Sequence, residues 1–277
     1  MSSVLFDLPG PTARRRHRVG GGIGVAGIAV VLGLVGWKLW QEGAIRPDKW
    51  SFLAVPGILE GLAEALGFTL LAAAVSIAAA IVFGAVFGAG RLSSHAVVRW
   101  PCILIVEFFR AVPLLLLIFF LFIAYGGTIK AFGALVVALM LYNGSVLAEI
   151  FRAGILAVPR GQSEAAYAIG LRKGQVMRLI LAPQAVRSML PAIVSQCVVA
   201  LKDTALGFTI GYAGFVHEAE FIFIAPIYNN PIAVGIMLMA VYVAINYSLS
   251  RLAHWLEQRQ RSVRGGVGAP AAVPDAQ

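Results

Sequence analysis

The fold of this chain is decided by a polar stretch that interrupts an otherwise apolar sequence: Glu164-Ala165-Ala166-Tyr167-Ala168-Ile169-Gly170, then nine residues, then Ile180-Leu181-Ala182-Pro183. Pro159 and Gly161 break the apolar helix that precedes it, and Gln162 or Ser163 suits the cap of a new helix. Gly170 suits a left-handed cap at the end of that helix. The pattern therefore predicts a short helix between two apolar segments.

This short helix is expected to carry a charge and a small apolar face. Glu164 falls in its first turn, where a negative charge suits the helix dipole. Ala165, Ala166 and Ile169 form the apolar face. We expect a second helix to follow and to close at Pro183, because proline lacks the backbone N–H that a helix interior needs.

The rest of the chain is far more apolar than a soluble protein. Of its 277 residues, 60% are hydrophobic and only 13% are charged, whereas a soluble domain carries about 25% charged residues. A helix needs about 20 apolar residues to cross the hydrocarbon of a bilayer. Six stretches qualify: about 19–39, 62–90, 100–125, 132–156, 190–211 and 231–252. We predict an all-α, polytopic membrane bundle of six transmembrane helices.

The distribution of positive charge predicts the orientation. Fifteen of the 22 lysine and arginine residues lie on the side of the N-terminus and three on the other side, so both termini are expected in the cytoplasm. The predicted parts are a basic N-terminus (1–18), a first helix with an external loop (19–61), a five-helix core (62–256) that contains the loop 157–189, and a tail without fixed structure (257–277). The net charge of +9 is then a topology signal, and no nucleic acid partner is predicted.

Several motifs suggest chemistry that their context excludes. Residues 22–27 match G-x-G-x-x-G, yet they lie in a membrane span with no strand before them. Close helix packing through small residues is the better interpretation, as it is for Gly84 with Gly88 and Gly207 with Gly211. No P-loop pattern occurs, and the two cysteines and four histidines show no ligand spacing. We predict no catalytic residue, no metal site and no ATP bound by this chain.

Charges inside the predicted spans are costly and are therefore candidates for function. Glu107 and Arg110 lie three apart on one helix face, and Glu149 and Arg152 repeat that spacing. The stretch Lys202-Asp203-Thr204 adds an opposite-charge pair and a hydroxyl. A cation and an anion together match the two ends of an amino acid zwitterion. The alternative is that the pairs only neutralise one another between helices, or reach the interface as expected of Arg152.

The polar loop resembles the EAA loop of the permeases of ABC importers, with the glutamate, glycine, isoleucine and proline of that family at Glu164, Gly170, Ile180 and Pro183. It departs from the family at Ala182, where leucine is usual. The resemblance implies the type I ABC importer permease fold, in which the short helix inserts into a groove on a separate ATPase subunit. The coupling residues that it implies are Glu164, Ala165, Ala166, Gly170, Ile180 and Pro183.

Other segments are similar to the polar amino acid branch of that family, the histidine, glutamine and glutamate type. They are Phe109-Arg110-Ala111-Val112-Pro113, Ala148-Glu149-Ile150-Phe151-Arg152 and Lys202-Asp203-Thr204. The N-terminal segment 4–11 and Tyr142-Asn143-Gly144-Ser145 look like actinobacterial glutamate-uptake permeases. The substrate-pathway residues implied are Glu107, Arg110, Asn143, Glu149, Lys202, Asp203 and Thr204, with glutamate as the expected substrate.

The resemblance also implies the partners and the mechanism. An external binding protein would deliver the amino acid, and a second, similar but non-identical permease would complete the pathway in the inner membrane. ATP and Mg²⁺ would bind at partner ATPase subunits, whose closure would drive alternating access. The alternatives are a secondary transporter driven by an ion gradient, a membrane-embedded enzyme and an export permease. None of these has a use for an EAA-type loop.

Overall fold

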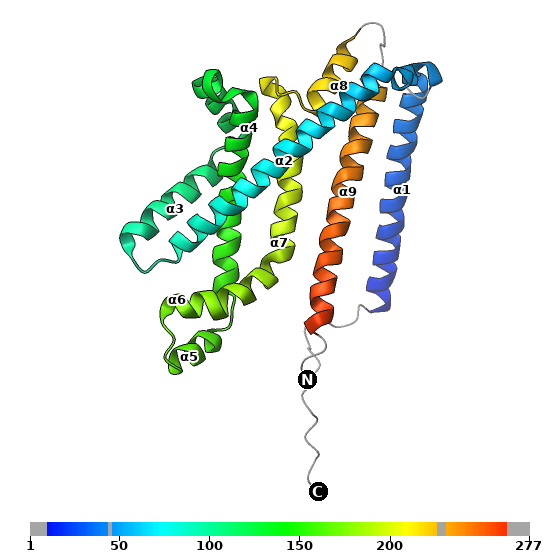
Figure 1. Ribbon diagram of the computed structural model, residues 1–277. Helices are drawn as coiled ribbons and strands as arrows, with labels where there is room; N and C mark the ends of the chain where they lie inside the picture. The colour runs from blue at the N-terminus through cyan, green and yellow to red at the C-terminus, as the bar shows by residue number, and fades with distance from the viewer. Residues whose placement is uncertain (1–9, 44–45, 226–230, 265–277) are drawn as a thin grey trace.

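The computed structural model describes residues 10–43, 46–225 and 231–264, and these are almost entirely helical (Figure 1). α1, α9, α7 and α4 run roughly side by side, and α2 crosses them obliquely, while short helices lie at both ends of the bundle. Five helical stretches are long and apolar enough to cross a membrane, and no strand occurs in the described ranges. The all-α bundle is confirmed. The structure has five such stretches rather than six because one long helix holds parts of two predicted spans.

The first two long helices run in opposite directions (Figure 1). α1 (Pro11–Gln41) begins with proline, whose missing N–H costs nothing at a helix start. η1 (Pro47–Ala54) crosses over to α2 (Pro56–Arg91). No heavy atom would lie within 4 Å of a Cβ added at Gly22 or Gly24, and none of the apolar window of α1 is buried. The close packing predicted for these glycines is therefore absent within the described chain.

The third predicted span, 100–125, is wrong as a single helix. α3 (Ala96–Ala111) ends before Pro113, and α4 (Leu114–Leu156) begins after it. Proline disfavours the helical conformation for the residue before it, and Val112 is extended, with φ −75° and ψ 128°. The break lies inside an uninterrupted apolar run, so hydropathy alone does not reveal it.

α4 bends sharply at its middle. Lys130 has φ 55° and ψ 178°, which are not helical angles, so two helices meet there. It is the one non-glycine residue with positive φ in the described chain. The second half of α4 corresponds to the predicted span 132–156, and the first half completes the broken third span.

The next membrane stretch is one continuous helical path made of four pieces: α6 (Lys173–Gln175), the π-helical η2 (Val176–Leu181), α7 (Ala182–Asp203) and the 3₁₀-helical η3 (Thr204–Ile210). The prediction that a helix closes at Pro183 is wrong. Pro183 lies in the first turn of α7, and the widened π turn before it accommodates the missing backbone bond. The path ends at Gly211, which is left-handed with φ 71°.

The last two helices are α8 (Phe215–Ile224) and α9 (Pro231–Arg264). α9 contains the predicted span 231–252 and remains helical past residue 257, where the tail without fixed structure was expected to begin. Residues 1–9 of the predicted N-terminal segment and 265–277 of the predicted tail lie outside the described residues.

The core forms where α2 crosses α4. A Cβ at Gly84 would lie 2.7 Å from Cβ of Leu147, and one at Gly88 would lie 2.9 Å from the carbonyl oxygen of Ala148. The two helices therefore approach more closely than any larger residue permits, as predicted for these glycines. Buried side chains from α2, α4 and the end of η3 continue the core: Ala72, Leu114, Leu117, Ile118, Ala134, Leu135, Ala138, Leu139 and Ile210.

Candidate functional site

The polar loop folds into the predicted short helix, α5 (Arg160–Ala168), at the end of the bundle opposite α8 (Figure 1). Its start differs from the prediction. Pro159 is the cap residue, Gly161 lies inside the helix, and the Ser163 hydroxyl donates to the Arg160 carbonyl at 2.7 Å instead of capping. Glu164 is consequently in the second turn and is exposed. The predicted first-turn position of Glu164 is wrong.

The end of α5 is as predicted. Gly170 is left-handed, with φ 84°. Its N–H donates to the carbonyl of Tyr167 at 2.9 Å, and the N–H of Leu171 donates to the carbonyl of Ala166 at 3.2 Å. These two bonds form a Schellman motif, which satisfies the last carbonyls of the helix and reverses the chain direction.

α5 packs on η2 through one face and leaves the other exposed. Ala166 is buried, as is Val176 of η2, and the side-chain amide of Gln184 in α7 donates to that of Gln162 at 3.4 Å. Ala165 is exposed, and Ile169 is 78% exposed. The predicted single apolar face is therefore divided, with Ala166 turned inward and the other two residues turned outward.

The remaining residues of the predicted loop site lie outside α5, in the segments that follow it. Ile180 is half-buried in η2, and Pro183 is exposed at the start of α7. Tyr167 and Leu179 are also exposed large side chains. This end of the molecule thus exposes the large side chains of Tyr167, Ile169 and Leu179 together with the carboxylate of Glu164.

A second group of predicted residues forms an ion-pair network between α2, α3 and α4. Nη2 of Arg91 lies 3.0 Å from a carboxylate oxygen of Glu107 and 3.1 Å from one of Glu149. Arg110 contacts Glu107 at 3.5 Å, and Arg152 contacts Glu149 at 2.6 Å. The two predicted i, i+3 pairs are thus present, and one residue joins them.

Arg91 is the member of this network that sequence reasoning missed. It was counted only as a positive charge at the end of a span, yet its side chain is 8% exposed. Its Nε and Nη1 atoms are buried and make no hydrogen bond. Three arginines therefore face two glutamates, and the network keeps one net positive charge among three helices. The sequence gives no signal for this contact, because Glu107 and Glu149 each already have an arginine three residues further on.

A third group is a polar chain between α4 and α7. The amide of the buried Asn143 donates to Asp203 at 3.4 Å, and its oxygen accepts from Gln196 at 2.6 Å. Sequence reasoning missed Gln196, because it lies in an apolar stretch with no charge nearby. The chain links the two helices through side chains that present both donors and acceptors.

The triplet Lys202-Asp203-Thr204 does not act as one unit. Asp203 faces Asn143, whereas the buried Thr204 hydroxyl donates to the carbonyl of Leu201 at 2.6 Å. Lys202 is exposed and lines an open groove of about 360 Å³ together with Tyr242 and Asn246 of α9. The structure therefore places the seven predicted pathway residues in separate groups. No group of three or more histidine, cysteine or acidic residues that could hold a metal occurs among the described residues.

Comparison with known proteins assigns these features to one family. A model of the binding-protein-dependent transport system inner membrane component matches residues 80–262, which include the ion-pair network, the polar chain and α5. The chain belongs to this family. The prediction that it is a transport subunit rather than an enzyme is confirmed by this membership, and the inner membrane location of a multi-pass chain agrees with it.

Individual relatives of this permease transport amino acids. The chain is 40% identical to the glutamate transport system permease protein GluD of Corynebacterium glutamicum, over 83% of each protein. It is 38% identical to the probable glutamine ABC transporter permease protein GlnP of Bacillus subtilis, over 69% of this chain and 90% of that one. A crystal structure of an amino acid ABC transporter with histidines matches with a TM-score of 0.69 and 29% identity, covering 75% of this chain and 98% of that one.

These likenesses confirm the predicted resemblance to amino acid importer permeases. They also disfavour the gradient-driven alternative, since the family is defined by transport that depends on a binding protein.

Proposed function

We propose that this permease forms half of the membrane pathway of an ABC importer for glutamate. The observation that carries the proposal is the capped, outward-facing helix α5 in a chain 40% identical to a glutamate permease. A binding protein outside the membrane delivers the substrate, and the chain crosses the inner membrane with both termini in the cytoplasm. A similar, non-identical permease supplies the other half.

α5 is the proposed contact with the ATPase. The exposed residues Glu164, Ala165 and Ile169 enter a groove on that subunit, while the Schellman turn at Gly170 keeps the helix rigid. ATP and Mg²⁺ bind at the ATPase, and its closure pushes α5. Since α5 packs on η2, which continues into α7, the movement reaches the polar chain at Asn143 and Asp203.

The polar groups are the proposed route of the substrate. Asp203 presents an anion to the ammonium group of an amino acid, and Arg110 presents a guanidinium for a carboxylate. Glutamate has two carboxylates and one ammonium group, so a pathway with more cationic than anionic groups suits it. The network around Arg91 provides such an excess.

Uptake of radiolabelled glutamate in cells that lack their own glutamate importers tests the substrate. We expect uptake from the chain expressed with its binding protein, second permease and ATPase, with competition by excess glutamate and little by histidine. Uptake of another amino acid with no glutamate uptake would overturn the substrate but not the importer. Uptake in vesicles without ATP would overturn the importer itself.

Purification of the tagged chain in gentle detergent tests the coupling helix. An ATPase subunit should co-purify, and Glu164→Trp should release it while the chain stays in the membrane. Glu60→Trp, a change of an exposed carboxylate in α2 at the other end of the bundle, is the control and should leave the ATPase bound. Equal ATPase recovery from both variants would show that α5 is not the contact.

A further inference from the structure

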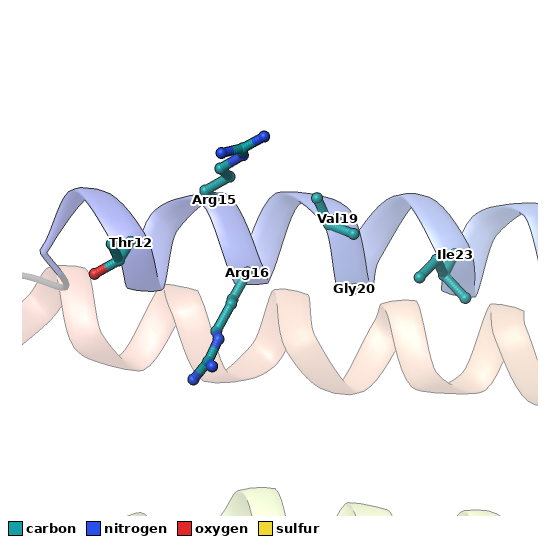
Figure 2. A pocket seen from close by; sticks show the side chains of 6 residues that line it. All are labelled: Thr12, Arg15, Arg16, Val19, Gly20 and Ile23. Atoms are coloured by element: carbon teal, nitrogen blue, oxygen red, sulfur yellow. The ribbon is translucent and has the colours of Figure 1, made fainter.

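The arginines of the ion-pair network converge, unlike those at the start of α1. Figure 2 shows that Arg15 and Arg16 project to different sides of α1. Arg91, Arg110 and Arg152, in contrast, come from α2, α3 and α4 and meet at the two glutamates of the network. The network therefore concentrates positive charge between three helices.

Arg110 has the weakest contact of the three arginines. Its Nη1 lies 3.5 Å from Oε1 of Glu107, beyond the distance of about 2.7–2.9 Å of a strong charge-assisted hydrogen bond. Arg152 instead contacts Glu149 through two nitrogens, at 2.6 and 3.1 Å. The side chain of Arg110 is also 37% exposed. The positive charge that a ligand can reach is therefore on Arg110.

Arg91 accounts for the loose contact of Arg110. Its Nη2 lies 3.0 Å from Oε1 of Glu107, the same atom that Arg110 contacts, and 3.1 Å from Glu149. Since the side chain of Arg91 is buried, water competes little for its guanidinium group. A glutamate whose charge is already matched by Arg91 attracts Arg110 less strongly.

The position of Arg110 suits a negatively charged ligand. It lies in the last turn of α3, directly before the break at Val112 and Pro113, and the run that follows the break is apolar. Charged side chains within such apolar stretches of a membrane protein almost always face the bundle interior or a water-filled cavity, where they mark substrate pathways. An accessible guanidinium group in this position can bind a carboxylate.

We propose that Arg91 is a positioning residue: by holding Glu107, it leaves Arg110 free to bind the side-chain carboxylate of an acidic amino acid. This role rests on the proposed function, in which the permease carries glutamate. The side-chain carboxylate suits Arg110 better than the α-carboxylate, because the net positive charge of the network repels the ammonium group next to the α-carboxylate. Arg91 thus favours acidic over neutral amino acids through Arg110.

Modification by phenylglyoxal, which reacts with accessible guanidinium groups, tests the role of Arg91 in the chain purified with its partner subunits. Mass spectrometry of peptides gives the modification rate of each arginine. Arg91→Gln lets Arg110 pair with Glu107, so modification of Arg110 should slow about threefold, as expected for a partly exposed ion pair. Arg91→Gln with Glu107→Gln removes that partner and should restore the rate. An unchanged rate in the single variant, or no recovery in the double one, would overturn the positioning role.

Glu149→Gln is the matched control. It also breaks one contact of Arg91, but it leaves Arg91 on Glu107 and should not slow the modification of Arg110. The exposed Arg178 of η2 is the internal reference and should react equally in all variants. If Arg91 only held the three helices together, Arg91→Gln would quicken the modification of Arg110, and this outcome would also overturn the proposal.

Protection by amino acids tests the ligand. Excess glutamate should slow the modification of Arg110 severalfold but not that of Arg178, whereas glutamine, which lacks the second carboxylate, should protect Arg110 less. Equal protection by the two amino acids, or none by glutamate, would overturn the carboxylate site. Uptake of radiolabelled glutamate by the unmodified importer separates the two proposals. Uptake without protection overturns only the role of Arg110, whereas a lack of glutamate uptake overturns the proposed function.

Discussion

At the scale of single residues, Gly170 is fixed by backbone geometry. Its φ of 84° is in the left-handed region, where a Cβ costs about 1 kcal/mol. Gly170→Ala should therefore loosen the end of α5, and we expect amide hydrogen exchange across residues 160–171 to quicken about fivefold. The measurement is exchange followed by mass spectrometry of the peptides from this loop.

Gly174 offers a matched control four residues later. It lies in the helical α6, its φ is not positive, and no atom would meet a Cβ there. Gly174→Ala should leave exchange unchanged or slow it slightly, because alanine favours the helix. If both variants behave alike, the left-handed turn does not hold α5.

Arg91 links three helices, because it contacts both Glu107 and Glu149. Replacing it with Gln removes the shared cation, while Glu107 and Glu149, which are 52% and 26% exposed, keep Arg110 and Arg152. The loss is then that of a hydrogen bond to a charged group, about 1.5–3 kcal/mol. We expect Arg91→Gln to lower the melting temperature of the purified chain by about 3 °C or more, at roughly 2–4 °C per kcal/mol. Differential scanning fluorimetry in detergent measures this.

A double variant separates this electrostatic effect from lost packing. Arg91→Gln with Glu149→Gln should cost less than the sum of the two single changes, because their 3.1 Å contact is lost only once. Arg178→Gln, which changes an exposed arginine of η2, should have little effect. Losses that simply add would show that Arg91 acts through its packing.

Residue-level prediction from the sequence succeeded where backbone or spacing rules apply. The left-handed Gly170 and the i, i+3 pairs follow from glycine geometry and from helix periodicity. Arg91 and Gln196 were missed, because their partners come from other helices, and a single sequence does not say which helix faces meet. Glu164 was placed one turn early, since helix starts depend on local capping that Pro159 decides.

At the scale of elements, the close crossing of α2 and α4 depends on glycine. Gly84→Ala would place a Cβ 2.7 Å from Cβ of Leu147, an atom that cannot move without its helix. Overpacking of this kind costs about 1–3 kcal/mol, so the melting temperature should fall. Gly67→Ala in the same helix meets nothing within 4 Å and should leave it unchanged or raise it. An equal change in both variants would show that the crossing does not depend on Gly84.

At the scale of elements, the sequence predicts where the apolar helices lie, but it does not predict where these helices break or bend. Five of the six predicted spans coincide with helical segments, because a bilayer demands about 20 apolar residues. The break at Val112 and Pro113 and the bend at Lys130 lie in apolar surroundings that hydropathy cannot divide. The helical path continues through Pro183 because the π-helical η2 precedes it. The sequence analysis placed the end of a helix there, since proline lacks a backbone N–H.

At the scale of the whole molecule, α1 is separable from the rest. None of its apolar window is buried in the chain, and the family match begins only at residue 80. The positive charges that fix orientation, at Arg91, in the loop around α5 and in α9, remain without it. A chain that lacks residues 1–43 should therefore still insert, and its melting temperature should stay within about 4 °C of the full chain, a change of about 1 kcal/mol.

A slightly longer truncation gives the control. Removing residues 1–55 also deletes η1, whose Phe52 is fully buried against Phe215 and Val234. Loss of a buried phenylalanine costs about 3–5 kcal/mol, so this variant should be clearly less stable than the shorter truncation. If both truncations are equally unstable, α1 is part of the folding unit. If only the longer truncation is unstable, α1 lies outside the folding unit and the α2–α9 bundle persists without it.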